Sequence, residues 1–464
     1  MDIRLHNTLS GKKEVFVPLK RREVGMYHCG PTVYNYPHIG NLRAYIFADT
    51  LKRLFIYAGY RVNQVINITD VGHLVSDGDD GDDKVEKMAK EQKKTAQDIA
   101  RYYTDVYFSN LRDLNIDTRG THFPRASEHV PEQIRMIEIL ESKGFTYRTN
   151  DGIYYDTSKF PQYGDLGHID IAGLREGERI GIHIEKKNLT DFALWKFSPK
   201  TKDATEKRQQ EWASPWGIGF PGWHIECSAM SMKYLGETFD IHTGGIDHIP
   251  VHHQNEIAQS EASTGKPFVH VWMHSAFVNI GGGKMAKSTG DFLTLEALKQ
   301  KGYSPLAYRY LLLGARYSTP LNFTEVSMDA AQKGYDNLHR MTEKLVSIEG
   351  IESNSSYKTK IEDFITDDLN TAGLLALMPE ILGNSSLRPG EKRYLIGIID
   401  SLTGLDLLKK PDLVPEEVQK LVRDRETAKT AKKWKEADSL REKIRSLGYE
   451  VMDTKDGQEV RKLI

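Results

Sequence analysis

Two cysteines are the only thiols among the 464 residues of this sequence, and they are its first candidates for chemistry. Cys29 lies at the end of a predicted strand, and Cys227 lies far along the chain in the run PGWHIECSAM. Thiolates are soft ligands that favour zinc, but a tetrahedral zinc site needs further ligands. Two cysteines exclude a disulfide scaffold and a structural zinc site made of cysteine alone. A lone cysteine is more often a small buried hydrophobic residue, so both interpretations stay open.

A histidine and a glutamate can supply the missing ligands. His252 and Glu256 are four residues apart in the run HHQNE, and a proline before the run with Gly265 after it predicts a helix. Residues four apart share one helix face, so these side chains form a bidentate unit for zinc. His253 would point about 100° away and is the weaker candidate. The alternative is a structural ion pair without metal.

Two other motifs are suited to phosphate. PHIGN (37–41) stands between a predicted strand and a predicted helix, where the helix N-terminus and an imidazole both stabilise an anion. GGGKMAKST (281–289) is a glycine-rich loop whose Lys284 and Lys287 can close on a triphosphate and offset the charge of leaving pyrophosphate. This loop lacks the Walker A spacing. Taken alone, the first motif is short and the second is typical of a basic surface loop.

A predicted strand–helix–strand unit positions these residues. Residues 23–29 and 62–68 predict strands, and apolar residues recur every three or four positions between Ala44 and Ala58, which predicts a helix. Such a unit has parallel strands, and ligands bind beyond the carboxyl ends of those strands. Cys29 and PHIGN follow the first strand directly. The sequence therefore predicts a ligand site at this edge of a sheet.

The chain divides into five predicted regions. An α/β domain with a Rossmann-type parallel sheet is split by an insertion, and a helical bundle and a small C-terminal module follow it. The hairpin-like run TYRTNDGIYYDTSKF marks the insertion. The predicted bounds are 1–119 and 193–304 for the two halves of the α/β domain, 120–192 for the insertion, 305–410 for the bundle and 411–464 for the module.

The charge balance excludes a uniformly basic nucleic-acid binder. The sequence has 63 Lys and Arg residues against 65 Asp and Glu residues. Residues 421–464 alone carry 12 basic and 9 acidic residues, so a basic surface is local. Trp434 lies among four lysines of that segment, where it either stacks on an unpaired RNA base or belongs to a core. No apolar run predicts a membrane span or a secretion signal, so a cytoplasmic protein is expected.

The two phosphate motifs together resemble a known pair. In this order, PHIGN and KMAKS resemble the HIGH and KMSKS signatures of class I aminoacyl-tRNA synthetases. Wider runs narrow the resemblance to cysteinyl-tRNA synthetases over nearly the whole chain. These runs are CGPTVYNYPHIGNLR (29–43), NITD (67–70), PGWHIECSAM (221–230), TGGIDHIPVHHQNEIAQ (243–259) and KMAKS (284–288).

The resemblance implies roles for individual residues. The family binds one zinc ion per chain, and its ligand positions fall on Cys29, Cys227, His252 and Glu256. Its amino-acid pocket falls on Thr69 and Trp223. Its ATP positions fall on His38, Gly40, Asn41, Gly244, Gly245, Asp247, Lys284 and Lys287, of which His38, Asn41, Lys284 and Lys287 support catalysis. Its anticodon-reading positions fall on Trp434, Asp438 and Asp453.

The resemblance also implies a reaction. The family activates L-cysteine with ATP and Mg²⁺ to cysteinyl-adenylate and transfers the cysteine to the terminal adenosine of tRNA(Cys). Shape alone rejects near-isosteric substrates by only about 10²-fold. Zinc binds thiolate far better than hydroxyl, so coordination can select cysteine over serine without an editing domain. A monomer without membrane attachment is expected.

Some residues depart from the family pattern, and two other functions compete. The departures are Asn41, Phe220, Ala286, Thr289 and Asp291; they bear on rate and on the positioning of the tRNA end, and none is a zinc ligand. A cysteine:amino-sugar ligase of the mycothiol type shares the zinc and adenylation chemistry but typically lacks the C-terminal module. A non-catalytic tRNA-binding paralogue should lose a signature lysine or a zinc ligand, and the sequence retains them all.

Overall fold

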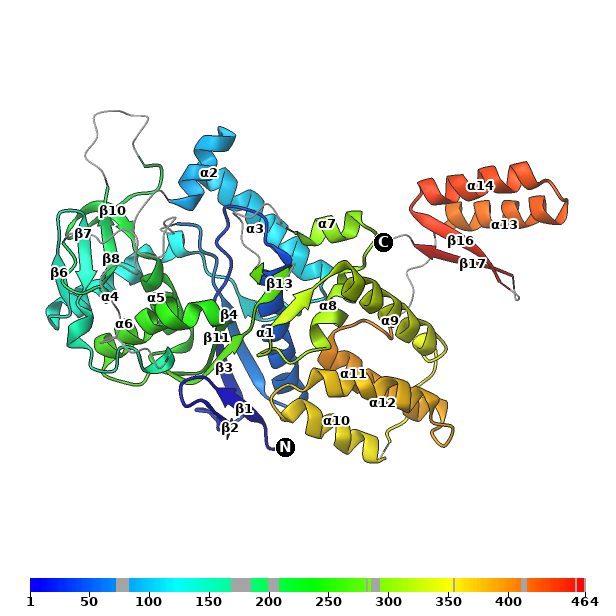
Figure 1. Ribbon diagram of the computed structural model, residues 1–464, viewed down its shortest axis with the longest axis horizontal. Coiled ribbons are helices and arrows are strands. Elements are labelled where there is room, and N and C mark those ends of the chain that lie inside the picture. The colour runs from blue at the N-terminus through cyan, green and yellow to red at the C-terminus, as the bar shows by residue number, and fades with distance from the viewer. Residues whose placement is uncertain are drawn as a thin grey trace.

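A five-stranded parallel sheet lies at the centre of the computed structural model, with the strand order β12-β11-β3-β4-β5 (Figure 1). The strands are β3 (Glu23–His28), β4 (Arg61–Ile66), β5 (Thr121–His122), β11 (Phe239–Gly245) and β12 (Val269–Ser275). The structure describes residues 1–71, 83–167, 185–198, 208–280, 283–284, 293–353, 355–409, 415–454 and 457–462. The predicted α/β fold with a parallel sheet is confirmed.

Both faces of this sheet are buried, because successive side chains of a strand point to opposite faces. On β3, Val24 and Met26 belong to one apolar core, whereas Tyr27 belongs to a second core. Helix α1 (Ile39–Tyr57) packs on the first face, and α5 (Trp223–Leu235) packs on the second. The sheet is thus held rigidly from both sides.

The predicted strand–helix–strand unit is confirmed as β3, α1 and β4. The two strands pair in parallel, with Tyr27 opposite Val65. Gly59 follows the helix with a φ of 83°, a conformation that favours glycine. From β3 the chain moves to β4 and β5 on one side, and it later returns to β11 and β12 on the other side. This reversal opens a crevice beyond the carboxyl ends of β3 and β11.

A second, antiparallel sheet of order β6-β7-β8-β10-β9 is inserted between β5 and β11. Its strands are β6 (Thr146–Arg148), β7 (Gly152–Tyr155), β8 (Phe192–Phe197), β9 (Trp212–Ser214) and β10 (Gly217–Pro221). The predicted hairpin is the β6–β7 pair. The predicted insertion, 120–192, differs from the extent of this sheet. Strand β5, which lies within 120–192, belongs to the parallel sheet, and strands β8 to β10 extend the antiparallel sheet to residue 221. The sequence did not indicate this, because the alternation of side chains does not reveal which sheet a strand joins.

The helical bundle packs against the body of the molecule, which comprises the parallel and antiparallel sheets and their helices. Its helices are α8 (Pro305–Leu313), α9 (Glu325–Glu343), α10 (Ser356–Thr366), α11 (Thr371–Gly383) and α12 (Pro389–Thr403). Helix α12 packs on α1. A fully buried ion pair joins Arg309 of α8 to Asp49 of α1. The bounds predicted at 304/305 and 410/411 stay predictions.

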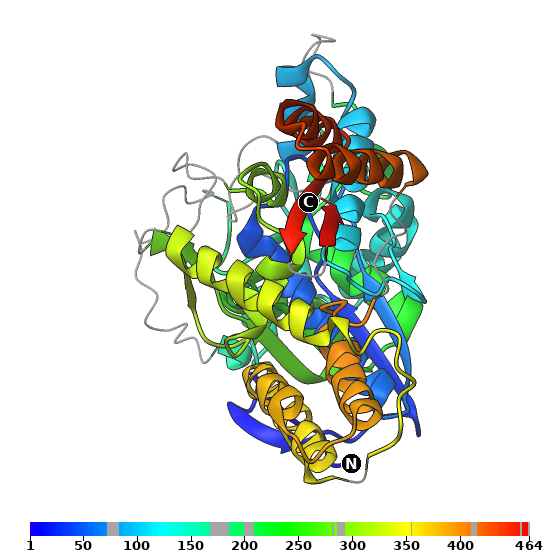
Figure 2. The same cartoon turned by 90° about the vertical axis from the view of Figure 1, so that its right-hand side faces the viewer.

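The C-terminal module projects to the right in Figure 1, and in Figure 2, where that side faces the viewer, it lies in front, above the helices of the bundle. It consists of α13 (Glu416–Thr430), α14 (Trp434–Ser446), β16 (Tyr449–Thr454) and β17 (Gly457–Lys462). Its buried core comprises Val418, Ile444, Tyr449 and Val451. None of the helices in the described residues combines the length and the apolar composition that a membrane crossing requires.

The other elements connect these parts. They are β1 (Arg4–Asn7), β2 (Lys12–Val15), α2 (Lys84–Gln92), α3 (Ala96–Asp113), α4 (Val130–Ser142), α6 (Gln254–Thr264), β13 (Val278–Ile280), β14 (Gly283–Lys284), α7 (Leu295–Gln300) and β15 (Leu321–Phe323).

Candidate active site

A cavity of about 420 Å³ lies in the crevice beyond β3 and β11. Most of the residues that the sequence assigned to zinc, cysteine and ATP line it, although they come from segments far apart in the chain. These residues are Cys29, His38, Gly40, Asn41, Thr69, Trp223, Cys227, Gly245, Asp247 and His252. The fold therefore brings the predicted substrate sites into one space.

Four potential metal ligands form a buried cluster at one end of the cavity. The ligand atoms of Cys29, Cys227, His252 and Glu256 all lie within 4.8 Å of one another. Nε2 of His252 is 3.1 Å from Oε1 of Glu256, as their spacing predicted. Two thiols, an imidazole and a carboxylate fit zinc. Except for Glu256, these residues line the cavity, so a metal held by them would face a substrate.

A second set of ligands overlaps the first. The ligand atoms of Cys29, His242, His253 and Glu256 are also within 4.8 Å of one another. A π-helical turn (Ile249–His253) precedes α6, so His253 does not follow continuous α-helical spacing. Its Nε2 lies 3.2 Å from Sγ of Cys29, a contact that the spacing of HHQNE did not indicate. The lining residues of the cavity include Cys29 but neither His242 nor His253, so the two histidines of this second set do not line the cavity.

Buried neighbours orient two ligands of the first set, Glu256 and His252. Nε2 of His242 lies 2.9 Å from the second carboxylate oxygen of Glu256. Nδ1 of His224 lies 2.9 Å from Nδ1 of His252, and the Trp223 ring stacks on the His252 ring at 4.4 Å. Such partners fix the orientation and tautomer of a ligand. Sequence reasoning missed His224 and His242, although His224 lies within PGWHIECSAM itself.

The electrostatics of the cluster favour a cation. Burial raises the pKa of Glu256, but the charges of His242 and His252 outweigh burial and lower this pKa to about 2. Burial also raises the pKa of Cys227, but hydrogen bonds with Cys29 and His252 bring it to about 6. Burial and the Cys227 thiolate raise the pKa of Cys29 well above its usual range. The cluster thus holds a carboxylate and a thiolate in a buried place, where a bound cation stabilises both.

The N-terminus of α1 forms the other end of the cavity. Nδ1 of His38 accepts a hydrogen bond from the backbone N–H of Asn41 at 3.1 Å, and Oδ1 of Asn41 accepts from the backbone N–H of His38 at 3.3 Å. This reciprocal cap uses Oδ1 of Asn41 and leaves its Nδ2 donor outside the cap. A Cβ at Gly40 would lie 3.0 Å from Nδ1 of His38, so glycine keeps this turn compact. The positive end of the helix dipole suits phosphate here.

The remaining ATP positions are placed less uniformly. Gly245 and Asp247 line the cavity, whereas Gly244 lies behind this wall, where a Cβ would come within 2.7 Å of Nδ1 of His248. Lys284 is the last residue of β14. Lys287 lies outside the described residues, as do Ala286, Thr289 and Asp291.

Thr69 is fixed by two buried neighbours. Its hydroxyl donates to Oε2 of Glu226 at 3.0 Å and accepts from Nδ2 of Asn67 at 3.0 Å. Burial raises the pKa of Glu226 well above its usual value. Phe220, a departure from the family pattern, has the guanidinium of Arg208 3.6 Å from its ring centroid. A guanidinium is thus still present beside this position, supplied by another segment.

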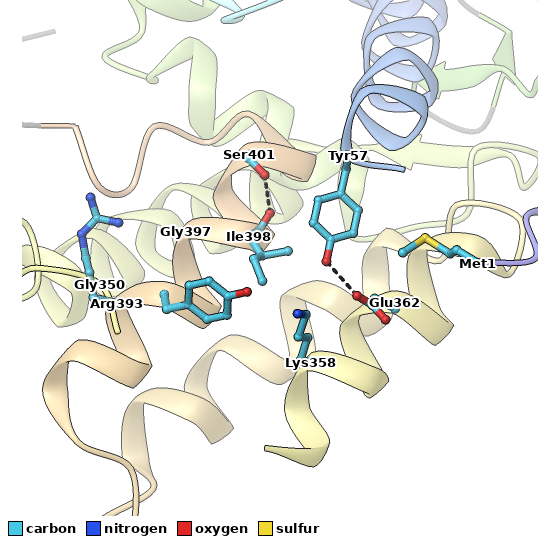
Figure 3. A pocket seen from close by; sticks show the side chains of 10 residues that line it. Met1, Tyr57, Gly350, Lys358, Glu362, Arg393, Gly397, Ile398 and Ser401 are labelled. Atoms are coloured by element: carbon cyan, nitrogen blue, oxygen red, sulfur yellow. Dashed lines mark hydrogen bonds between the residues drawn. The ribbon is translucent and has the colours of Figure 1, made fainter. Parts of the chain in front are cut away.

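A larger cavity of about 570 Å³ lies away from this chemistry, between α1, α10 and α12 (Figure 3). Lys358, Arg393 and Tyr394 line it, and the Tyr57 hydroxyl donates to Glu362 at 3.0 Å across its wall. Neither cysteine lines this cavity, nor does any other residue that the sequence assigned to a site. Its size therefore does not make it the active site.

The predicted anticodon residues lie on the C-terminal module. Trp434 is the first residue of α14 and is 58% exposed, so it is not a core residue. Asp438 is exposed one turn later. Asp453 of β16 accepts hydrogen bonds from Arg425 at 2.9 Å and Lys429 at 2.7 Å.

Comparison with known proteins agrees with this arrangement. The family described as tRNA synthetases class I (C) catalytic domain matches residues 15–333, and the family described as cysteinyl-tRNA ligase anticodon binding domain matches residues 411–461. The chain is 44% identical to cysteine–tRNA ligase 1 of Burkholderia lata, over 99% of this chain and 97% of that protein. The chain belongs to the cysteine–tRNA ligase family. It is also 40% identical to the cysteine–tRNA ligase of Treponema denticola, over 98% of both proteins.

Solved structures of other synthetases share the fold. A methionyl-tRNA synthetase of Mycobacterium tuberculosis, in complex with methionyl-adenylate, has a TM-score of 0.55 at 12% identity and covers 83% of this chain and 90% of its own. A leucyl-tRNA synthetase of Agrobacterium radiobacter, in a ternary complex, has a TM-score of 0.58 at 11% identity and covers 86% of both chains. At such low identity these likenesses concern the fold alone.

Proposed function

We propose that this chain is a cysteine–tRNA ligase that joins L-cysteine to tRNA(Cys) at the expense of ATP. The observation that carries the proposal is the shared cavity. It has a cluster of thiol, imidazole and carboxylate groups at one end and the capped N-terminus of α1 at the other. One end is suited to a thiol and the other to a phosphate, which are the groups that cysteine activation must hold together.

Selection of cysteine is assigned to the end that carries the ligands. One zinc ion would be held by Cys29, Cys227, His252 and Glu256. When bound, this zinc would bind the thiolate of the substrate cysteine much more strongly than the hydroxyl of serine. Thr69 and the face of Trp223 line the cavity beside this cluster and would enclose the amino acid. The hydrogen bonds to Asn67 and Glu226 hold Thr69 in one orientation.

Activation is assigned to the other end. The carboxylate of cysteine attacks the α-phosphate of ATP, and pyrophosphate leaves. The N-terminus of α1, His38 and Asn41 would bind the phosphates, and Gly245 and Asp247, which line the cavity, would lie under the adenosine. Gly244 would allow the backbone to pass close to His248 behind this wall. Lys284 and Lys287 would offset the charge of the pyrophosphate. Magnesium would accompany ATP. A hydroxyl of the terminal adenosine of the tRNA then attacks the carbonyl carbon of the adenylate, and AMP leaves.

The C-terminal module is assigned to the anticodon. Trp434 has an exposed ring for stacking, and Asp438 lies on the same helix face because it is four residues further on. Arg425 and Lys429 would position the carboxylate of Asp453 so that it accepts a hydrogen bond from a base. We also propose that the chain acts as a monomer in the cytoplasm.

The competing functions are less well supported. The match of residues 411–461 to the anticodon binding domain disfavours an amino-sugar ligase, which typically lacks that module. The complete set of zinc-ligand positions disfavours a non-catalytic paralogue.

The proposal is tested by charging of tRNA(Cys) with labelled cysteine, in parallel with an amino-sugar acceptor and with labelled serine. Transfer of cysteine to tRNA alone is expected. Transfer to the amino sugar, or the absence of any ATP–pyrophosphate exchange dependent on cysteine, would contradict the proposal. Metal analysis of the purified protein should find about one zinc ion per chain.

A further inference from the structure

Three tyrosines from two separate segments form a cluster beside the active site. Tyr36 precedes α1, and Tyr102 and Tyr103 lie on α3. The Tyr36 ring meets the Tyr102 ring at 6.2 Å and the Tyr103 ring at 5.2 Å, both edge to face. The hydroxyls of Tyr36 and Tyr102 lie 2.7 Å apart and share a hydrogen bond. We call these three residues the tyrosine cluster.

One member of the tyrosine cluster anchors the other two. Tyr103 is only 4% exposed and its hydroxyl accepts a hydrogen bond from Gln92 at 3.0 Å, so its ring is fixed. Tyr36 is 36% exposed and Tyr102 is 45% exposed. The structure thus holds two large aromatic rings in a defined orientation while leaving much of their surface in water. The hydrophobic effect does not explain why Tyr36 and Tyr102 are tyrosines, because the part of an aromatic ring that stays in water does not stabilise the fold by burial.

The tyrosine cluster is continuous with the active-site cavity. Tyr36 lines the cavity two residues before His38, and Lys84 of α2 lines it as well. On the outer side, the ammonium of Lys94 lies 5.5 Å from the centre of the Tyr102 ring. In Figure 1, α2 and α3 lie at the top of the catalytic body. A nucleic-acid strand that enters the cavity past Tyr102 and Tyr36 would therefore meet an aromatic surface and the ammonium of Lys94.

We propose that the tyrosine cluster binds the unpaired nucleotides at the 3′ end of the tRNA by stacking on Tyr102 and Tyr36, with Lys94 beside their phosphates. This inference rests on the proposed function, because it requires that the terminal adenosine reach the cavity. Aromatic rings accept any base on their faces, and a neighbouring cation tracks the backbone. Tyr102 does not line the cavity, so it acts on transfer and not on activation.

The test compares Tyr102→Ala with Tyr102→Phe and Tyr102→Leu. Tyr102→Ala is expected to lower the single-turnover rate of transfer from preformed adenylate to tRNA about tenfold at subsaturating tRNA. Tyr102→Phe keeps the ring and should retain most of the rate, whereas Tyr102→Leu keeps bulk without the aromatic face and should resemble alanine. The ATP–pyrophosphate exchange without tRNA should be unchanged in all three variants.

A truncated tRNA separates stacking from general binding. For tRNA that lacks its 3′-terminal unpaired nucleotides, the inhibition constants of wild type and Tyr102→Ala should agree. For intact tRNA carrying 2-aminopurine as its terminal base, the fluorescence should be quenched on binding to wild type and Tyr102→Phe but not to Tyr102→Ala.

Several outcomes overturn the inference. Equal transfer rates for wild type and Tyr102→Ala would show that the ring does not bind the tRNA end. An equal loss in Tyr102→Phe and Tyr102→Ala, or a parallel loss of pyrophosphate exchange, would assign Tyr102 to bracing Tyr36 through the hydroxyl pair. If the wild type fails to charge tRNA(Cys), the proposed function itself is wrong. If the wild type charges tRNA(Cys) and the Tyr102 variants do so equally well, only the inference about the tyrosine cluster is wrong.

Discussion

The catalytic body and the C-terminal module present their functional residues in opposite environments. Cys227, His252 and Glu256 are at most 2% exposed, whereas Trp434 is 58% exposed. Charge interactions are stronger away from water, so a metal and its thiolate partner benefit from burial. A base can stack only on a ring that is open to solvent. The two regions therefore show that one substrate requires a preformed interior and the other an accessible surface.

The cores and ion pairs that hold these residues in place are also more buried in the body than in the module. The body has an apolar core on each face of the sheet whose strand ends carry the site, and it contains a fully buried ion pair. The module relies on a small core, and the ion pairs of Asp453 are half exposed. Substitutions at polar groups should therefore cost far more in the body than in the module.

The largest effect is expected for Asp49→Asn. Arg309 would stay buried without its counter-charge, so the free energy of unfolding should fall by about 3–5 kcal/mol. Burial raises the pKa of Asp49, but Arg309 and Arg53 outweigh it and lower that pKa. The stabilisation is therefore present above the usual aspartate pKa and is lost as the pH falls through the lowered value. Urea unfolding followed by circular dichroism at neutral and acidic pH measures both effects.

Exposed Asp105 on α3 provides the control for this substitution. Asp105→Asn should leave the stability within about 0.5 kcal/mol of wild type. If Asp49→Asn is equally mild, or if it loses as much stability in acid as wild type does, the buried pair does not join the body to the bundle as described.

The next largest effect is expected for Cys227→Ser. A serine hydroxyl is a poor ligand for zinc, so cysteine-dependent ATP–pyrophosphate exchange should fall by at least about 100-fold together with the metal content. Filter binding of tRNA should be retained, because the module is unaltered. Full exchange activity in this variant would contradict the assignment of the ligands.

His253→Ala distinguishes the two overlapping sets of ligands. If Cys29, Cys227, His252 and Glu256 hold the metal, His253 is only a neighbour, and the variant should keep one ion per chain with about 10–100-fold lower affinity. Competition with a chelator measures that affinity. If His253→Ala lost the metal completely while Cys227→Ser retained it, the ion would belong to the second set, Cys29, His242, His253 and Glu256.

A smaller effect is expected for Trp434→Ala. Loss of one stacking contact should raise the Kd for tRNA(Cys) about tenfold, while cysteine activation stays unchanged. Fluorescence titration and pyrophosphate exchange measure the two quantities separately. Trp434→Phe is the matched variant, and it should bind tRNA more tightly than the alanine variant. Unchanged aminoacylation in Trp434→Ala would count against a role in reading the anticodon.

The smallest effect on stability is expected for Asp453→Asn. Hydrogen bonds with Arg425 and Lys429 lower the pKa of Asp453, but its carboxylate is half exposed and solvent screens the pairs. The free energy of unfolding should fall by only about 0.2–1 kcal/mol. Thermal unfolding at low and high salt measures this change, and a loss as large as that of Asp49→Asn would remove the contrast between the two regions.

The sequence indicated the site better than it indicated the boundaries. Cys29, Cys227, His252 and Glu256 were predicted as ligands, and the structure brings them within 4.8 Å of one another. Residues 193–304 were predicted as the second half of the α/β domain, and strands β9 and β10 within that range pair in the antiparallel sheet. Alternating side chains show that a segment is a strand, but the choice of partner depends on long-range hydrogen bonds that no local pattern contains.

His253 and Tyr102 illustrate what local reasoning misses. Regular helix geometry made His253 the weaker ligand candidate, but it did not indicate that Nε2 of His253 lies 3.2 Å from Sγ of Cys29. No motif in its own segment singles out Tyr102, and its proposed role follows only from α3, which places its ring against Tyr36. Both depend on a contact between residues that lie far apart in the chain.

The sequence by itself determined the types of residue, their spacing within each motif and the unit formed by β3, α1 and β4, because helix and strand periods are local properties. It also determined that only Cys29 and Cys227 can supply thiols. Only the tertiary structure decided which histidines face the cavity, because the reversal of strand order between β3 and β11 sets which strand ends meet. It likewise decided that Trp434 is exposed, since the burial of a side chain depends on what the rest of the chain packs against it.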